Sequence, residues 1–213
     1  MKVCIFGMSG SGKSHKARAM LKDHRRVLVI DPSRDWERQG FGEPLRGDGN
    51  TISAALAKGI ARKAFRFTYC PPHGRDVQAM AEIARALMHY QLPYMESTGK
   101  RGADCVMVMD EAAALYPNAA AMRPGNPVSA LILQGRHYGI GLLAISQRPA
   151  DVALQLRSQA QVTHAFKLVD ESSVKAVRAL HMAAAGLDLP GLPPRRYYSI
   201  SGDGVTGPHM EGK

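Results

Sequence analysis

The stretch "VCIFGMSGSGKSHKARAM", from Val3 to Met20, is the part of the sequence that decides the fold. Its first four residues are apolar and predict a buried strand, while the stretch from Lys13 onward predicts a helix. Between them lies the pattern G-x-x-x-x-G-K-[ST], matched at Gly7, Gly12, Lys13 and Ser14. Because a strand precedes the pattern and a helix follows it, we interpret this segment as a phosphate-binding loop.

The chemistry of this loop predicts ATP and Mg²⁺ as ligands. Backbone N–H groups of the loop surround the β-phosphate, Lys13 neutralises the β/γ oxygens, and Ser14 is a ligand for Mg²⁺. The expected nucleotide-binding residues are Gly7, Ser9, Gly10, Ser11, Gly12, Lys13 and Ser14. The alternative is a purely structural glycine turn.

Short apolar runs alternate with helix-like stretches along the rest of the chain, which predicts an α/β fold with a mostly parallel sheet between helices. We expect one domain over residues 1–213. Strands are expected at 3–6, 27–30, 65–70, 105–109, 140–145 and 164–168, and helices at 13–23, 77–90, 128–137, 151–157 and 171–180. The tail from Pro193 predicts a C-terminal strand, antiparallel to the rest of the sheet, with a glycine-containing turn. Residues 94–104 are expected to form a polar loop.

Composition suggests a partner and a compartment. The chain has 213 residues and a net charge of +10, an excess that favours a polyanion such as nucleic acid over the alternative of a merely basic enzyme. Its three cysteines lack metal-ligand spacing, which favours reduced thiols and a cytoplasmic location, either in a host cell or at a virion vertex. We expect no signal peptide and no transmembrane segment, since no apolar run approaches about 20 residues.

Two adjacent carboxylates, Asp110 and Glu111, follow the apolar run "CVMVM". The carboxyl ends of parallel strands line the ligand crevice of an open sheet. We therefore expect Asp110 to approach the Mg²⁺ ion and Glu111 to activate a water molecule beside the γ-phosphate. The alternative is that one of them caps the following helix.

The segment "GRHYGIGLLAISQRP", residues 135–149, places Gln147 at the end of another apolar strand. An amide there can hydrogen-bond both the γ-phosphate and the attacking water, and Ser146 is a candidate to assist it. A solvated turn is the alternative for a strand that ends in Ser-Gln.

The sequence from Gly135 to Leu168 resembles the HerA/FtsK superfamily of P-loop motor ATPases, in which a Gly-Arg…Tyr-Gly-(apolar)-Ser/Thr-Gln-Arg-Pro segment follows the Asp-Glu strand. "VIDPSRDW" also looks like that family's Asp-Pro segment. The resemblance implies a RecA-like fold of the additional-strand, catalytic-glutamate type. It also implies a ring, usually a hexamer, that moves double-stranded DNA by ATP hydrolysis.

In such rings a neighbouring subunit inserts an arginine beside the transferred phosphoryl group. Arg136 matches the family's arginine and is the first candidate; Arg148 is the second. For both, the alternative is a surface ion pair. Basic residues on pore loops are expected to contact the DNA backbone, with Lys100 and Arg101 as the best candidates and ordinary solvated charge as the alternative.

A motor core of this length, without added domains, is similar to the genome-packaging ATPases of tailless internal-membrane viruses and phages, which implies a capsid vertex or portal as a further partner. Three alternatives stay open: a HerA/FtsK-like DNA-processing ATPase of cellular origin, a small-molecule phosphotransferase of nucleoside-kinase type, and a basic assembly protein that binds nucleotide only for structure.

Overall fold

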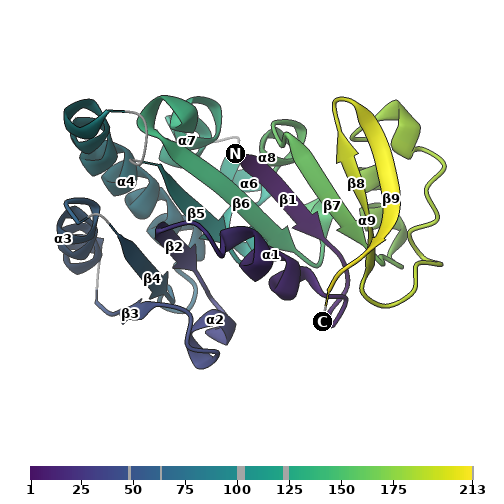
Figure 1. Ribbon diagram of the computed structural model, residues 1–213, viewed down its shortest axis with the longest axis horizontal. Coiled ribbons are helices and arrows are strands. Elements are labelled where there is room, and N and C mark those ends of the chain that lie inside the picture. Colours follow the sequence, from purple (N-terminus) through teal and green to yellow (C-terminus); the bar gives the residue numbers. More distant parts are fainter. Residues whose placement is uncertain (48, 63, 100–103, 122–124, 213) are drawn as a thin grey trace.

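A computed structural model of the chain describes residues 1–47, 49–62, 64–99, 104–121 and 125–212. Its strands are β1 (Lys2–Phe6), β2 (Arg26–Ile30), β3 (Glu43–Leu45), β4 (Phe65–Tyr69), β5 (Cys105–Met109), β6 (Ile140–Ser146), β7 (Val162–Phe166), β8 (Arg196–Ser201) and β9 (Gly204–Met210). They join one sheet in the order β3-β4-β2-β5-β6-β1-β7-β8-β9 (Figure 1). Pairs from β3 to β7 are parallel, and β8 and β9 pair antiparallel.

The mostly parallel sheet and its antiparallel C-terminal end confirm the predicted fold class, although the tail contributes a hairpin rather than a single strand. The position of β6 is the feature that matters for the site. It lies between β1, which leads into the glycine loop, and β5, which leads into Asp110. This is the additional strand that the resemblance implied.

Helices cover both faces of the sheet. The α-helices are α1 (Lys13–Leu21), α2 (Asp35–Arg38), α3 (Gly49–Ile60), α4 (Asp76–Thr98), α5 (Ala112–Leu115), α6 (Asn118–Ala121), α7 (Pro127–Gln134), α8 (Leu154–Ser158) and α9 (Glu171–Arg178). The described residues also form the 3₁₀ turns η1 (Gly135–Tyr138), η2 (Pro149–Asp151) and η3 (Met182–Ala184). Among the described residues no helix is both long and apolar enough to span a bilayer.

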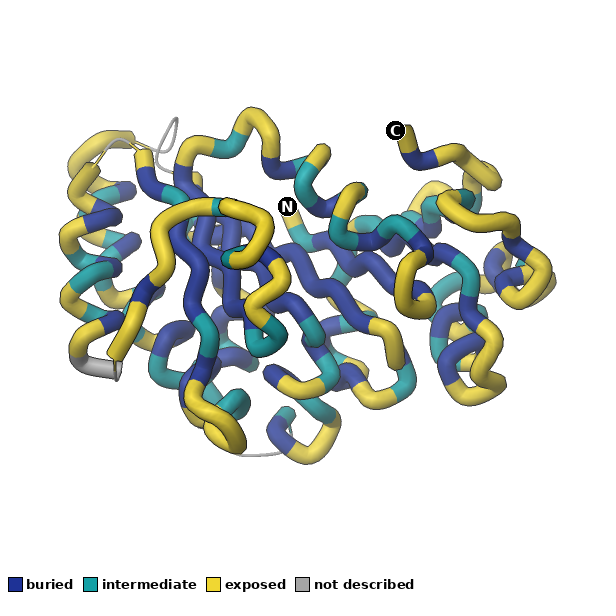
Figure 2. Tube along the Cα trace, turned by 90° about the horizontal axis from the view of Figure 1, so that it is seen from below, coloured by how far each residue is buried: buried dark blue, intermediate teal, exposed yellow. Residues whose placement is uncertain are grey.

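Alternate residues of the central strands belong to two different hydrophobic clusters. Cys4 and Phe6 belong to the larger cluster, while Val3 and Ile5 belong to the smaller one, which also contains Ala17 and Leu21 of α1. Successive strand residues point to opposite faces, so each face of the sheet needs its own apolar cover. Figure 2 shows the result, with buried strands in the centre and exposed segments around them.

The expectation of a loop over residues 94–104 was wrong in its first part. Residues 94–98, expected in a loop, form the last turn of α4, which continues through Pro93. Proline removes one helical hydrogen bond, but Gln91 and Met95 are buried on either side of it, and this packing keeps the helix going. The glycine-rich segment after α2 contains the edge strand β3, which is only three residues long and was not predicted from the sequence.

Candidate nucleotide-binding and hydrolysis site

The glycine loop folds as a phosphate-binding loop does. Gly10 and Gly12 have φ of 72° and 109°, values that side chains disfavour. Gly7 has no room for a side chain, because a Cβ there would lie 2.6 Å from the Cβ of Phe166. The N–H of Met8 donates to the carbonyl of Lys167 over 2.8 Å, which anchors the loop to the end of β7.

The N-terminus of α1 is left open for an anion. Gly12 occupies the N-cap position without a side-chain cap, and the first turn of the helix contains no acidic residue. The Oγ of Ser11 is buried and has no hydrogen-bond partner within the described part of the chain. Free N–H groups and the helix dipole favour negative charge at this point, so the loop suits a phosphate group.

Lys13 lies inside the site rather than on the surface. It is only 7% exposed, and its Nζ donates to the carbonyl of Met8 over 2.9 Å. Burial lowers the pKa of Lys13, while the nearby charges of Glu111 and Asp110 act in the opposite direction. The ammonium group is therefore bound to the loop and feels the charges of both carboxylates, as expected of a group that meets β/γ oxygens.

Asp110 is a buried carboxylate among other carboxylates. Burial, followed by the charges of Asp31 and Glu111, raises the pKa of Asp110 to about 7. Asp31 itself is fixed, since its side chain accepts from the backbone N–H groups of residues 35–37 over 2.9–3.2 Å and so caps α2. Excess negative charge at one point of the sheet favours a bound cation.

Glu111 occupies the N-cap position of α5, but its side chain makes no capping bond. Its backbone is left-handed, with φ 55° and ψ 55°, a conformation that costs a residue with a Cβ about 1–2 kcal/mol. Instead of capping, Oε1 of Glu111 accepts a hydrogen bond of 2.7 Å from Nε2 of Gln147. Strain of this kind concentrates at functional sites.

The strand register explains how Glu111 and Gln147 meet. Phe6 is level with Ser146, and Met109 with Ala144, across three neighbouring parallel strands. The residues just beyond these strands therefore stand side by side at the same edge of the sheet. The glycine loop begins at this edge too, which brings the three predicted motifs together.

The residues at this edge fit a magnesium ion. The described residues contain no group of three or more His, Cys, Asp or Glu side chains able to hold a metal. Magnesium in nucleotide sites takes only one or two side chains and completes its shell with phosphate oxygens and water. Ser14 lines the loop pocket, and Asp110 is buried at the neighbouring strand end with an elevated pKa. These two side chains would hold the ion.

The predicted arginines lie in different places. Arg136 is in η1, next to the start of β6, and its charge acts on Lys2 at the start of β1. It is therefore at the opposite edge of the sheet from the glycine loop. Arg148 is at the correct edge, but its Nε pairs with Oδ2 of Asp151 over 3.0 Å, and both side chains are more than half exposed. Lys100 and Arg101 lie outside the described residues.

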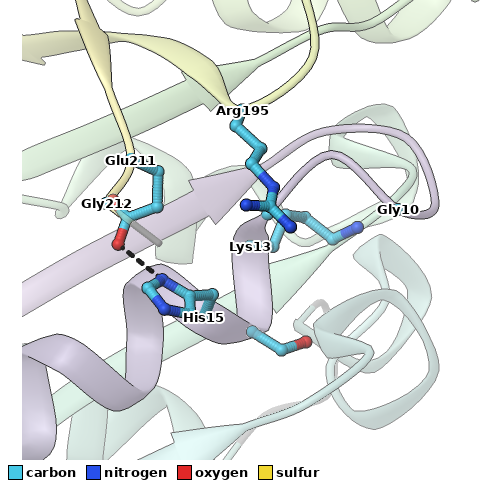
Figure 3. A pocket seen from close by; sticks show the side chains of 8 residues that line it. Gly10, Lys13, His15, Arg195, Glu211 and Gly212 are labelled. Carbon is cyan, nitrogen blue, oxygen red and sulfur yellow. Dashed lines mark hydrogen bonds and ion pairs between the residues drawn. The ribbon is translucent and has the colours of Figure 1, made fainter.

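Sequence reasoning missed a second set of residues around the loop. A cavity of about 240 Å³ is lined by Gly10, Gly12, Lys13, Ser14, His15, Arg195, Glu211 and Gly212 (Figure 3). Arg195 precedes β8 and Glu211 follows β9, so the C-terminal hairpin supplies one wall. The only signal in the sequence was the basic run "PPRRYY", which does not indicate a position beside the loop.

No protein-family model and no curated protein matches this sequence. Solved structures do resemble the fold. The genome packaging NTPase from Sulfolobus turreted icosahedral virus 2, in complex with ATP-γS, has a TM-score of 0.73 and 16% identity over 99% of this chain and 97% of that one. VirB4 of Thermoanaerobacter pseudethanolicus has a TM-score of 0.63 and 14% identity over 100% and 90% of the two chains. EssC (ATPases 2 and 3) from Geobacillus thermodenitrificans has a TM-score of 0.56 and 11% identity over 96% and 38%.

These likenesses extend over nearly the whole chain and concern its fold. The chain has a P-loop NTPase fold, as the sequence predicted.

Proposed function

We propose that this protein is an ATPase whose hydrolysis drives the movement of double-stranded DNA, and that it works as a viral genome-packaging motor. The observation that carries the ATPase assignment is the hydrogen bond between Gln147 and Glu111. It joins the ends of β5 and β6 at the edge where the glycine loop begins. A loop that only bound nucleotide would have no need of a positioned carboxylate and amide beside the terminal phosphate.

The chain's own groups suggest how hydrolysis proceeds. The loop N–H groups and Lys13 hold the phosphates and stabilise the charge that develops on the β/γ oxygens. Glu111 accepts the proton of a water molecule that attacks the γ-phosphate, while the bond from the γ-phosphorus to the bridging oxygen breaks and ADP leaves. Gln147 orients both Glu111 and that water. Ser14 and Asp110 would hold Mg²⁺, whose charge would offset that of the phosphates.

The position of Gln147 also supports a motor. Gln147 ends β6 and Arg136 stands just before its start, so one buried strand links the hydrolysis edge of the sheet to the opposite edge. A rigid strand can transmit a small change at the γ-phosphate to the far side of the subunit. In a ring, that far side is where a neighbouring subunit would respond.

The polyanion in this proposal is duplex DNA. The net charge of +10 supports backbone binding without base readout, as a motor that moves along any sequence requires. Similarity over nearly the whole length of a packaging NTPase supports the viral role. A homo-oligomeric ring, a hexamer by the resemblance, and a capsid vertex or portal partner complete the proposal.

The test is the ATPase rate of the purified protein with and without double-stranded DNA, together with the particle mass. We expect turnover that duplex DNA stimulates and that Lys13→Ala abolishes. Lys22→Ala, an exposed lysine just beyond the same helix, is the control and should behave as wild type. Phosphorylation of an added nucleoside would support the kinase alternative, and nucleotide binding without turnover would support a structural role.

A further inference from the structure

We infer that Arg195 is a nucleotide ligand supplied in cis by the C-terminal hairpin, and that it contacts the α/β-phosphate part of the nucleotide rather than the γ-phosphate. The inference rests on the proposed nucleotide site and adds a residue outside the three motifs to it.

The position of Arg195 is the first argument. Its Cα and Cγ lie 3.8 Å from where a Cβ on Gly12 would be, so it packs directly against the glycine loop. Figure 3 shows its side chain reaching from the start of the hairpin toward Lys13. Two cations that line one cavity repel each other unless an anion lies between them. No acidic side chain forms an ion pair with Arg195 in the described part of the chain.

Backbone conformation is the second argument. Arg195 has φ 59°, one of three residues other than glycine with positive φ among those described. Another of the three is Glu111, in the hydrolysis site. A left-handed arginine costs stability that glycine or asparagine at the same place would not. Arginine at this position is explained if its side chain is needed in the cavity.

The hairpin that carries Arg195 is fastened to the helix after the loop. The carbonyl of Arg195 accepts from the N–H of Glu211 over 2.8 Å. The buried Glu211 side chain meets Nδ1 of His15 at 3.0 Å and Nζ of Lys16 at 3.7 Å. Nζ of Lys16 also donates to the hydroxyl of Tyr197 over 2.8 Å. These contacts hold the start of the hairpin at a fixed distance from the loop.

Strand order decides which phosphate Arg195 meets. β6 and β5 lie on one side of β1, and β7, β8 and β9 lie on the other. Glu111 and Gln147 are on the first side, where the γ-phosphate must be for hydrolysis. The hairpin is on the second side. A nucleotide that spans the loop therefore places its α/β-phosphates and nucleoside toward Arg195, where a guanidinium binds phosphate by two parallel hydrogen bonds.

The experiment measures the affinity of Arg195→Gly for ADP and for the non-hydrolysable analogue AMPPCP, each with Mg²⁺, by calorimetry. Glycine suits the left-handed backbone, so the variant should unfold at the wild-type temperature or higher. We expect affinity for both ligands to fall by about 10- to 100-fold, and equally, since both contain α- and β-phosphates. Arg196→Ala, which removes the neighbouring arginine outside the cavity, is the matched control and should bind as wild type.

The possible outcomes separate the two proposals. Wild-type affinity in Arg195→Gly would overturn the role of Arg195 while leaving the nucleotide site intact. A loss confined to AMPPCP would overturn the assignment to the α/β-phosphates, as would an equal loss in Arg196→Ala. If the wild-type protein bound neither ligand, the proposed function itself would fail.

Discussion

Nε2 of Gln147 lies 2.7 Å from Oε1 of Glu111, although the two residues are 36 positions apart in the chain. The contact exists because β6 is inserted between the loop strand and the carboxylate strand, with all three strands in register. Gln147 is exposed and Glu111 is half-buried, so a water molecule and a γ-phosphate can reach both. This hydrogen bond connects Glu111, the proposed general base, to the end of β6, the strand that runs to the opposite edge of the sheet.

The first prediction concerns this pair. Glu111→Gln should reduce ATP hydrolysis by about 10²- to 10⁴-fold, because the amide cannot take the proton of water, and should leave ATP affinity nearly unchanged. Gln147→Ala should cause a smaller loss, because Glu111 and the attacking water lose the amide that orients them while the proton acceptor itself remains. Steady-state turnover and calorimetric binding separate the two effects. Gln159→Ala, at an exposed glutamine away from the site, is the control, and full turnover in Glu111→Gln would refute the base assignment.

The second prediction separates Asp110 from Glu111. Asp110→Asn removes the buried charge that would hold Mg²⁺, so we expect affinity for ATP to fall in the presence of Mg²⁺ and to change little in EDTA. Glu111→Gln should show no such difference. Titrating a fluorescent ATP analogue with and without Mg²⁺ measures both. Equal Mg²⁺ dependence in the two variants would mean that their roles are wrongly divided.

Local patterns predicted much of this site. The glycine loop, Asp110 and Glu111 are each read from fewer than ten residues, and parallel strands place such residues at one edge. The wall formed by Arg195 and Glu211 could not be found in this way. Glu211 contacts His15, which is 196 positions earlier in the chain. No sequence pattern predicts where a C-terminal hairpin will lie relative to the glycine loop. The helical turn beyond Pro93 was missed because tertiary packing outweighs a local helix breaker.

The third prediction concerns pH and His164 on β7. Burial, and then the charges of Lys16 and His209, lower the pKa of His164 from 6.5 to about 4. The unfolded chain therefore binds more protons than the folded one between these values, and the free energy of unfolding falls as pH drops through the window. The loss attributable to His164 should reach about 3 kcal/mol at pH 4, at about 1.4 kcal/mol per pKa unit.

Denaturant unfolding at pH 7, 5.5 and 4 measures this loss. His164→Gln should flatten the dependence, at some cost in stability at pH 7 from its contact with Ser199. His137→Gln, at an exposed histidine, should keep the wild-type slope. An unchanged slope in His164→Gln would show that other groups cause the acid sensitivity.

The fourth prediction concerns the anchor of the hairpin. Glu211→Gln removes a buried charge that meets both His15 and Lys16, so we expect the free energy of unfolding to fall by about 1.5–3 kcal/mol. Nucleotide affinity should fall with it, since the wall of the cavity loosens. Glu171→Gln removes a fully solvated pair with Lys175 and should change stability by no more than about 0.5 kcal/mol. If Glu211→Gln and Glu171→Gln had equal effects on stability and nucleotide affinity, the contacts of Glu211 would not be what holds this wall of the cavity in place.

The last prediction concerns the arginine that acts between subunits. Arg136 stands near the start of β6, while the glycine loop follows the end of β1, so the length of a strand, about 15–20 Å, separates them within one subunit. Arg136 can therefore meet a nucleotide only in a neighbouring subunit. Arg136→Ala should abolish hydrolysis with ATP affinity nearly intact, because arginine fingers contribute about 10³ to 10⁵ in rate.

Mixing variants tests the shared site directly. Arg136→Ala subunits keep a working loop and Lys13→Ala subunits keep a working arginine, so rings that contain both should recover turnover that neither variant shows alone. Arg148 is the other candidate, although its exposed pair with Asp151 gives it a partner within its own subunit. If Arg148→Ala is inactive and recovers on mixing while Arg136→Ala does not, the finger is Arg148. If neither recovers in rings shown by mass to be mixed, the nucleotide site is not shared between subunits.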